Sequence, residues 1–268
     1  MRKNAWVICC CTAVLAAFGT FFRWLQDQVC FEAETGLAVR GSIWPYAVAL
    51  MIVIAAVVLA VVCFRMKNQP HTSFPDSLPA AFAAAQRVRT IGGIVLGALL
   101  AVGGAWLMIS SGTLSSPGLQ RVLAVLAIVT GAAFARQMLA PGDAEATSGA
   151  VVCVSMPIVL LAFWLIVSYK VNIINPTISA YAVEILALCA ALIAFYQLAG
   201  FAYGRPKAIK SIFWSQFAAF LCITALPDDR TGAQQLMLAA IAGILVFQSY
   251  LTASNIRPAV SGPVGGAQ

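Results

Sequence analysis

Long apolar runs of about 20 residues alternate with short polar segments along almost the whole chain. A helix needs about 20 residues to cross a hydrocarbon core of roughly 30 Å. Open strands leave backbone groups unpaired in lipid, and barrel strands alternate in shorter segments. The pattern therefore predicts an all-α, polytopic transmembrane helix bundle of about eight spans. The predicted spans are 5–24, 44–64, 91–110, 119–139, 150–169, 178–200, 211–226 and 234–253.

The composition agrees with this fold class. Hydrophobic residues make up 62% of the 268 residues and charged residues 9%, whereas an ordinary soluble domain is about 25% charged. We expect a single transmembrane helical domain over residues 1–257 and a disordered tail over 258–268. The alanine-rich segment from Pro79 is expected to continue into the third span as one helix, because alanine favours helix.

The distribution of basic residues predicts the orientation. Eleven Lys and Arg residues lie at one set of span ends and five at the other set. Cytoplasmic segments carry the excess of positive charge, so we expect both termini to be cytoplasmic. Trp24, Tyr46 and Trp164 then fall at outer span ends, as aromatic residues at a membrane interface do. The same distribution accounts for the net charge of +7 without a nucleic-acid partner, and the lipid bilayer is the partner it predicts.

Cysteine and histidine usage indicates no metal or cofactor site. Seven of the eight cysteines fall inside apolar spans, and only Cys30 is expected in an external loop. The one histidine, His71, lies in a loop, and there is no CxxC, HExxH or GxSxG motif. We therefore expect no cofactor, no metal and no enzymatic activity.

One carboxylate, Glu184, lies inside a predicted span, about two turns from its outer end. A carboxylate in a membrane helix costs on the order of 2–3 kcal/mol on insertion scales. Tyr181 is three residues earlier, so it shares the same helix face. Two hypotheses stay open: Glu184 is a proton or cation site with Tyr181 as its hydrogen-bond partner, or it is a paired carboxylate that fixes helix packing.

Several other polar residues in the late spans are candidates for a polar cavity. Gln197, Gln216 and Gln248 lie in the inner halves of three different spans, with Tyr196 and Ser249 close to two of them in sequence. They either line a cavity or bridge helices by hydrogen bonds.

The last outer loop contains the sequence Asp228-Asp229-Arg230. Two adjacent aspartates point in different directions and lack a third ligand nearby in the sequence, so we expect a solvated turn here.

The third predicted span carries small residues at four-residue spacing: Gly93, Gly97, Ala101 and Ala105. Small residues at this spacing let two helix backbones approach closely. This seam is either a face for self-association or, as is more common, a site of internal helix packing.

A short segment after the first span carries the one family resemblance. Phe31-Glu-Ala-Glu-Thr-Gly-Leu37 follows Arg23-Trp-Leu-Gln and leads to Gly41-Ser. These roughly 20 residues resemble a stretch in uncharacterised multi-pass membrane proteins of Gram-positive (Firmicutes-type) gut bacteria. The resemblance implies a bacterial cytoplasmic membrane and brings no activity with it.

The function expected from the sequence is that of a non-enzymatic membrane subunit or structural protein, working with other membrane subunits or with copies of itself. The alternative is a small proton- or cation-coupled transporter that uses Glu184. A transporter would place Glu184 in a cavity open to one side, with the late glutamines along it. A structural protein would hold Glu184 against a specific donor in a closed bundle. Transport usually needs more intramembrane polar groups than Glu184 and a few glutamines, so the first function is favoured. Broken helices near the membrane midplane would support transport, and only Pro157 offers a break.

Overall fold

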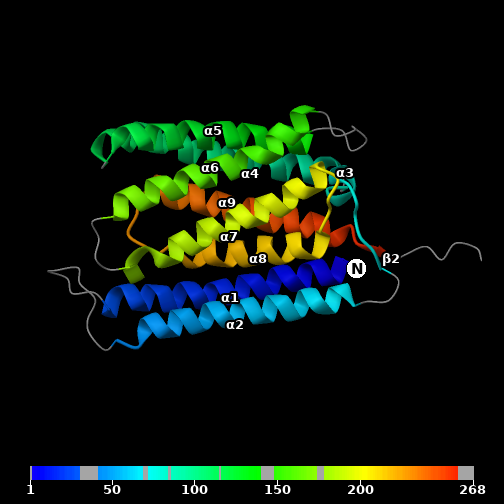
Figure 1. The fold of residues 1–268 in the computed structure, drawn as a ribbon, viewed down its shortest axis with the longest axis horizontal. Helices are drawn as coiled ribbons and strands as arrows, with labels where there is room; N and C mark the ends of the chain where they lie inside the picture. Colours follow the sequence, from blue (N-terminus) through cyan, green and yellow to red (C-terminus); the bar gives the residue numbers. More distant parts are fainter. Residues whose placement is uncertain are drawn as a thin grey trace, which may run out of the picture.

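Eight long helices run side by side along the longest axis of the molecule (Figure 1). The computed structural model describes residues 2–30, 42–68, 72–83, 86–114, 116–139, 148–173 and 178–258. The long helices within these ranges are α1 (Arg2–Val29), α2 (Trp44–Lys67), α4 (Gln86–Ser110), α5 (Pro117–Leu139), α6 (Ser148–Asn172), α7 (Ile178–Ala202), α8 (Ala208–Thr224) and α9 (Gly232–Ser254). The short elements are β1 (Thr72–Ser73), α3 (Leu78–Ala81), the 3₁₀ turn η1 (Ser111–Thr113) and β2 (Arg257–Pro258).

Seven of these helices are long and apolar enough to cross a membrane. The other long helix, α8, is apolar but has only 17 residues, which corresponds to about 26 Å against a hydrocarbon core of roughly 30 Å. The prediction of an all-α bundle with about eight spans is confirmed. The chain is therefore a multi-pass membrane protein.

The two ends of the bundle are distinguished by the elements that lie there. The N-terminus and β2 lie at the same end, on the right in Figure 1. We call this the proximal end and the opposite one the distal end. The C-terminal ends of α1 and α6 and the start of α9 lie at the distal end.

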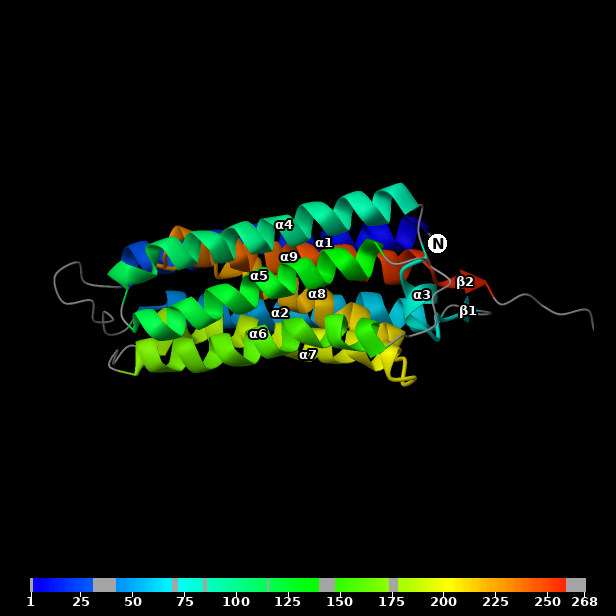
Figure 2. The same ribbon diagram turned by 90° about the horizontal axis from the view of Figure 1, so that it is seen from above.

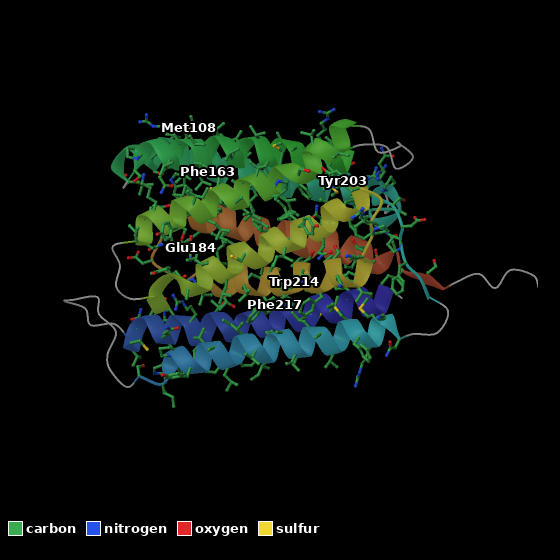
Figure 3. All side chains as sticks on the ribbon, in the orientation of Figure 1. Met108, Phe163, Glu184, Tyr203, Trp214 and Phe217 are labelled. Carbon is green, nitrogen blue, oxygen red and sulfur yellow. The ribbon has the colours of Figure 1, made fainter. Side chains whose placement is uncertain are left out.

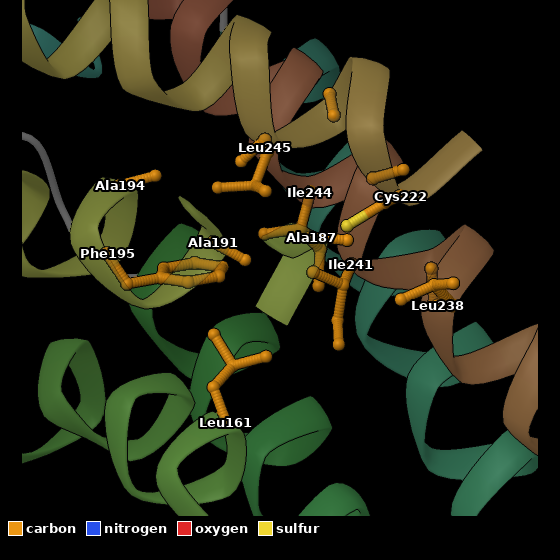
Figure 4. Packing of buried hydrophobic residues seen from close by; sticks show 14 of the residues in the cluster. Leu161, Ala187, Ala191, Ala194, Phe195, Cys222, Leu238, Ile241, Ile244 and Leu245 are labelled. Atoms are coloured by element: carbon orange, nitrogen blue, oxygen red, sulfur yellow. The ribbon is translucent and has the colours of Figure 1, made fainter. Parts of the chain in front are cut away.

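The centre of the bundle is formed by α8 and α9. Helices α4 and α1 lie on one face and α6 and α7 on the opposite face, with α8 and α9 between them (Figure 2). In its most apolar stretch 67% of α9 is buried, compared with 22% of α2, so α9 is central and α2 is peripheral. Figure 4 shows Leu161 of α6, Phe195 of α7, and Ile241 and Leu245 of α9 packed in this core.

The segment between α2 and α4 folds back onto the proximal end. Strand β1 pairs antiparallel with β2, and Thr72 lies opposite Pro258. The tail predicted over 258–268 therefore has its first residue in β2, and residues 259–268 lie outside the described residues.

Helix α3 is a separate element and does not lead into α4. It ends at Ala81, and α4 begins at Gln86, so the prediction of one continuous helix from Pro79 is wrong. Leu78 and Phe82 are buried in the main apolar core, and Asn255 Nδ2 donates a hydrogen bond of 2.8 Å to the Ala81 carbonyl. The free energy gained by burying Leu78 and Phe82 outweighs the tendency of the following alanines to extend the helix, so α3 ends here.

The small-residue seam of α4 packs against α5 within the same chain. A Cβ atom built on Gly97 would lie 2.5 Å from the Gly131 carbonyl oxygen of α5, and one on Gly104 would lie 2.7 Å from the Ala124 carbonyl oxygen. Gly93 likewise faces Met138 of α5. The close approach of the two backbones therefore requires glycine in α4.

The position that completes this seam differs from the predicted one. Ala101 contacts Gly131, whereas Ala105 is exposed and falls outside the contact. With 3.6 residues per turn, a residue twelve positions after Gly93 is rotated by about 120° from it, and one eleven positions after by about 20°. Gly104 therefore takes the place expected for Ala105.

Adding a methyl group at Gly97 tests this contact. Gly97→Ala must push α4 away from α5, so we expect the free energy of unfolding to fall by about 1–3 kcal/mol, measured by denaturant titration in detergent micelles. Gly118→Ala is the control, since no atom lies within 4 Å of a Cβ at Gly118 at the start of α5. Equal stability of the two variants would contradict the close α4–α5 packing.

Candidate functional site

A recessed turn between α8 and α9 lies at the distal end. Helix α8 ends at Thr224, short of the distal ends of α1 and α5 (Figure 1). Pro227 follows, and a proline cannot continue the backbone hydrogen bonding of a helix. Thr231 then caps α9 by accepting from the Gln234 backbone N–H. The turn is fixed from α9 because Gln235 Nε2 donates to the carbonyls of Leu226 and Asp228.

Helix α1 approaches α8 closely just below this turn. A Cβ on Gly19 would lie 2.5 Å from Thr224 Oγ1, so any larger residue here would displace the side chains of α8. One residue later, Thr20 Oγ1 donates a hydrogen bond of 3.2 Å to the Ile223 carbonyl, which also accepts from the Leu226 backbone N–H at the end of α8. Arg23 follows one turn further along α1 and thereby faces the recessed turn.

The Asp228 carboxylate joins two arginines from different parts of the chain. Its Oδ1 accepts a hydrogen bond of 2.6 Å from Arg23 Nε, and its Oδ2 accepts one of 2.6 Å from Arg230 Nη2. Asp228 is 5% exposed and Arg23 is 1% exposed. Gln26 Oε1 also accepts from Arg23 Nη1 at 2.9 Å.

Glu184 extends this network to α7. Its Oε2 lies 3.4 Å from Arg230 Nε, and Figure 3 places it towards the distal end of the bundle. Ser168 and Trp164 of α6 lie beside the same carboxylate and line the same cavity. Asp27, one turn after Arg23 on α1, lies 3.8 Å from Arg23 Nη2.

These groups form one chain of alternating charges, which we call the distal ion network: Asp27, Arg23, Asp228, Arg230 and Glu184. Moving an isolated charge out of water costs several kcal/mol even after relaxation. Alternating signs at hydrogen-bonding distance offset that cost, and removing one member leaves its neighbour buried and unpaired. The network therefore ties α1 and α7 to the recessed turn.

A cavity of about 620 Å³ lies over the distal ion network. Its walls come from α1, α6, α7, the recessed turn and the start of α9. Gln28 and Asp229 are exposed and line it, so the cavity opens at the distal end. A volume of 300–1,000 Å³ is usual for sites that bind small molecules.

The structure brings together only part of the predicted site. Glu184 and Tyr181 both line the cavity. The carboxylate has its ion pair with Arg230, however, and no hydrogen bond from the Tyr181 hydroxyl to it is found among the described residues. The predicted partnership of Tyr181 with Glu184 is thus replaced by one with Arg230.

The three late glutamines do not share this cavity with Glu184. None of Gln197, Gln216 and Gln248 is among the described residues that line it. Gln216 Nε2 instead donates to Ser249 Oγ at 2.9 Å and contacts Cys9 Sγ at 3.4 Å. This contact joins α8, α9 and α1 by hydrogen bonding, which was one of the two open interpretations.

Three expectations about the distal residues need correction. The Asp228-Asp229-Arg230 segment is not wholly a solvated turn, since Asp228 is buried and only Asp229 is exposed. Asp27 belongs to α1, which runs beyond the predicted first span to Val29. Trp164 is 1% exposed and faces Glu184 instead of the membrane interface.

Sequence reasoning missed the distal ion network because each member was taken separately. Arg23 and Asp27 lie four positions apart, and a basic and an acidic residue at that spacing form a pair on a helix. That spacing, together with the acidic and basic residues after Pro227, was the available signal. No group of three or more potential metal ligands occurs in the part of the chain that the structure describes.

The two adjacent aspartates allow a matched test of the network. Asp228→Asn leaves Arg23 and Arg230 without their shared carboxylate, so we expect a loss of about 3–5 kcal/mol in the free energy of unfolding. Asp229→Asn should change stability by less than about 0.5 kcal/mol, because its side chain is exposed. Denaturant titration in micelles measures the free energy of unfolding of both variants. A loss of similar size in the two would show that the buried ion pairs of Asp228 do not stabilise the protein.

Known proteins were compared with the chain in three ways. No family model, no curated protein and no solved structure matches it. The resemblance to proteins of Gram-positive gut bacteria stays a prediction, and its segment, residues 31–37, lies outside the described residues. What the chain does is therefore inferred from the charges and shape of the distal cavity.

Proposed function

We propose that this membrane protein binds a small polar solute in its distal cavity and transports it, without enzymatic chemistry. The observation that supports this most is the cavity of about 620 Å³ over buried, ion-paired charges. Ion pairs alone can hold helices together, but that role needs no open cavity beside the charges, whereas binding a polar solute does. This proposal favours the transporter alternative over the subunit that the sequence suggested.

In the proximal half of the bundle, the described residues pack tightly against one another, which fits the closed side of a transporter in one state. A second apolar cluster packs α1, α2, α8 and α9 together there, with Ile8, Leu59, Met66 and Ile212 at most 5% exposed. The Gln216–Ser249 hydrogen bond lies in the same half. Access from one side only is the arrangement that alternating-access transport requires at each stage of its cycle.

The positive-inside distribution makes the distal end the outer one. The cavity then opens away from the cytoplasm, in the cytoplasmic membrane of a bacterium, as the segment at residues 31–37 implies. A solute would enter past Gln28 and Asp229, which are exposed. Glu184, which pairs with Arg230 and lies beside Ser168 and Trp164 of α6, positions the charges of the site.

A second function, that of a membrane subunit, is favoured by a different feature. Helix α9 is uncovered between α1 and α4, and an apolar groove of about 710 Å³ lies there. Small residues such as Ala13, Ala242 and Gly243 line it beside Phe247. Small residues are common where transmembrane helices meet.

Filling the distal cavity distinguishes the two functions. Val171 of α6 lines the cavity, so Val171→Trp should abolish uptake of the transported solute into proteoliposomes. The solutes to be tested are sugars, polyols, amines, amino acids and carboxylates. Val152→Trp is the control, because Val152 is an exposed valine of the same helix that does not line the cavity.

Two outcomes would contradict the transport proposal. One is that no solute of the set is bound or taken up by the unchanged protein. The other is that Val171→Trp and Val152→Trp take up a bound solute equally well. Either outcome would leave the subunit as the better-supported function.

A further inference from the structure

We infer that the ligand of the distal cavity is a small zwitterion carrying an extra positive charge, of which a basic amino acid is the simplest kind. This inference rests on the proposed function and specifies its substrate class. It follows from one unpaired atom on each of two oppositely charged side chains and from the charge left over in the cavity.

The first unpaired atom belongs to a positive side chain. The Arg230 side chain is 7% exposed and lines the cavity. Its Nε pairs with Glu184 and its Nη2 with Asp228, but its Nη1 is buried without a hydrogen-bond partner among the described residues. A guanidinium donates hydrogen bonds in a planar fork that matches a carboxylate. Arg230 Nη1 is buried in this state, so a ligand carboxylate would pair with it only after the guanidinium turns towards the cavity.

The second unpaired atom belongs to a negative side chain. Asp27 Oδ2 is buried and also lacks a partner within the described part of the chain, while the side chain as a whole is 24% exposed and lines the cavity. Its contact with Arg23 is 3.8 Å long, compared with 2.6 Å between Arg23 and Asp228. A partial rotation about the soft χ2 torsion would turn this oxygen towards the cavity. Asp27 is thus the least satisfied carboxylate of the network, and it fits an ammonium group.

Leaving either atom unpaired costs free energy that a ligand of matching charges can recover. A buried donor or acceptor atom without a hydrogen bond loses its hydration without compensation, even when the rest of its group is paired. A ligand with one carboxylate and one ammonium group supplies a partner for each. A simple amine or a simple carboxylate supplies only one.

The remaining charge favours a ligand with net positive charge. The described lining residues include four carboxylates, Asp27, Glu184, Asp228 and Asp229, and two guanidinium groups, Arg23 and Arg230. Arg23 and Arg230 neutralise two of the carboxylates, and two negative charges are left over. Lysine should therefore bind more tightly than alanine, and alanine more tightly than glutamate, because nearby charges act strongly in a site shielded from water.

The volume is compatible with this class. About 620 Å³ lies within the range of cavities that enclose small organic ligands. Asn172 and Gln234 line the same space and carry amide groups that both donate and accept.

Binding to the full-length protein in nanodiscs tests the inference. The probes are lysine, alanine, glutamate, ethylamine and acetate, measured by calorimetry. We expect lysine to bind more tightly than any other probe. Asp27→Asn should weaken lysine binding by about tenfold to a hundredfold, as expected for loss of one charge-assisted hydrogen bond. Asp76→Asn, the same change at an exposed proximal position, should leave it unchanged.

Substitution of Arg230 would disturb the buried network, so the probe series tests its role. Lysine should bind at least tenfold more tightly than ethylamine, which lacks the carboxylate. Equal affinity for lysine and ethylamine, or tighter binding of glutamate or acetate, would overturn the inference. So would equal lysine binding by Asp27→Asn and Asp76→Asn.

The failure of this inference can be told from failure of the proposed function. If a sugar or polyol enters proteoliposomes and Val171→Trp blocks it while no amino acid binds, the cavity is a transport site for a different ligand class. If no solute of either set binds, both proposals are wrong.

Discussion

The distal half of the molecule depends on one buried carboxylate shared by two arginines. Asp228 accepts from Arg23 through one oxygen and from Arg230 through the other, each at 2.6 Å. Each of the three charges would be costly inside the bundle by itself, and together they offset one another. Because Arg23 belongs to α1 and Arg230 continues to Glu184 of α7, this single carboxylate fixes the relative positions of two helices far apart in sequence.

The geometry that brings these charges together comes from apolar features of the chain. Helix α8, with 17 residues, ends below its neighbours, and so the turn that carries Asp228 lies inside the bundle end. Gly19 lets α1 approach α8 closely enough for Arg23 to reach that turn. The same recess leaves the space that forms the distal cavity. A short helix and one glycine thus determine where polar groups can exist inside an otherwise apolar protein.

The fold was predictable from the sequence to a large extent, whereas the site was predictable only in part. In lipid, a run of about 20 apolar residues can satisfy its backbone hydrogen bonds by forming a helix. The helix bundle and its spans can therefore be predicted directly from these runs. Glu184 stood out because a carboxylate is rare in such a run. Its partner Arg230 lies 46 positions away, and pairing over that distance depends on how α7 and the recessed turn pack. No periodicity along the chain encodes that contact.

The sharing of Asp228 is tested most directly by a double-mutant cycle with Arg23→Gln and Asp228→Asn, using the free energy of unfolding in micelles. If the two side chains form a buried pair, the double variant should be more stable than the sum of the single losses implies, by at least about 1.5 kcal/mol. Additivity within about 0.5 kcal/mol would mean that Arg23 and Asp228 act independently, which would contradict a distal end held together by their interaction.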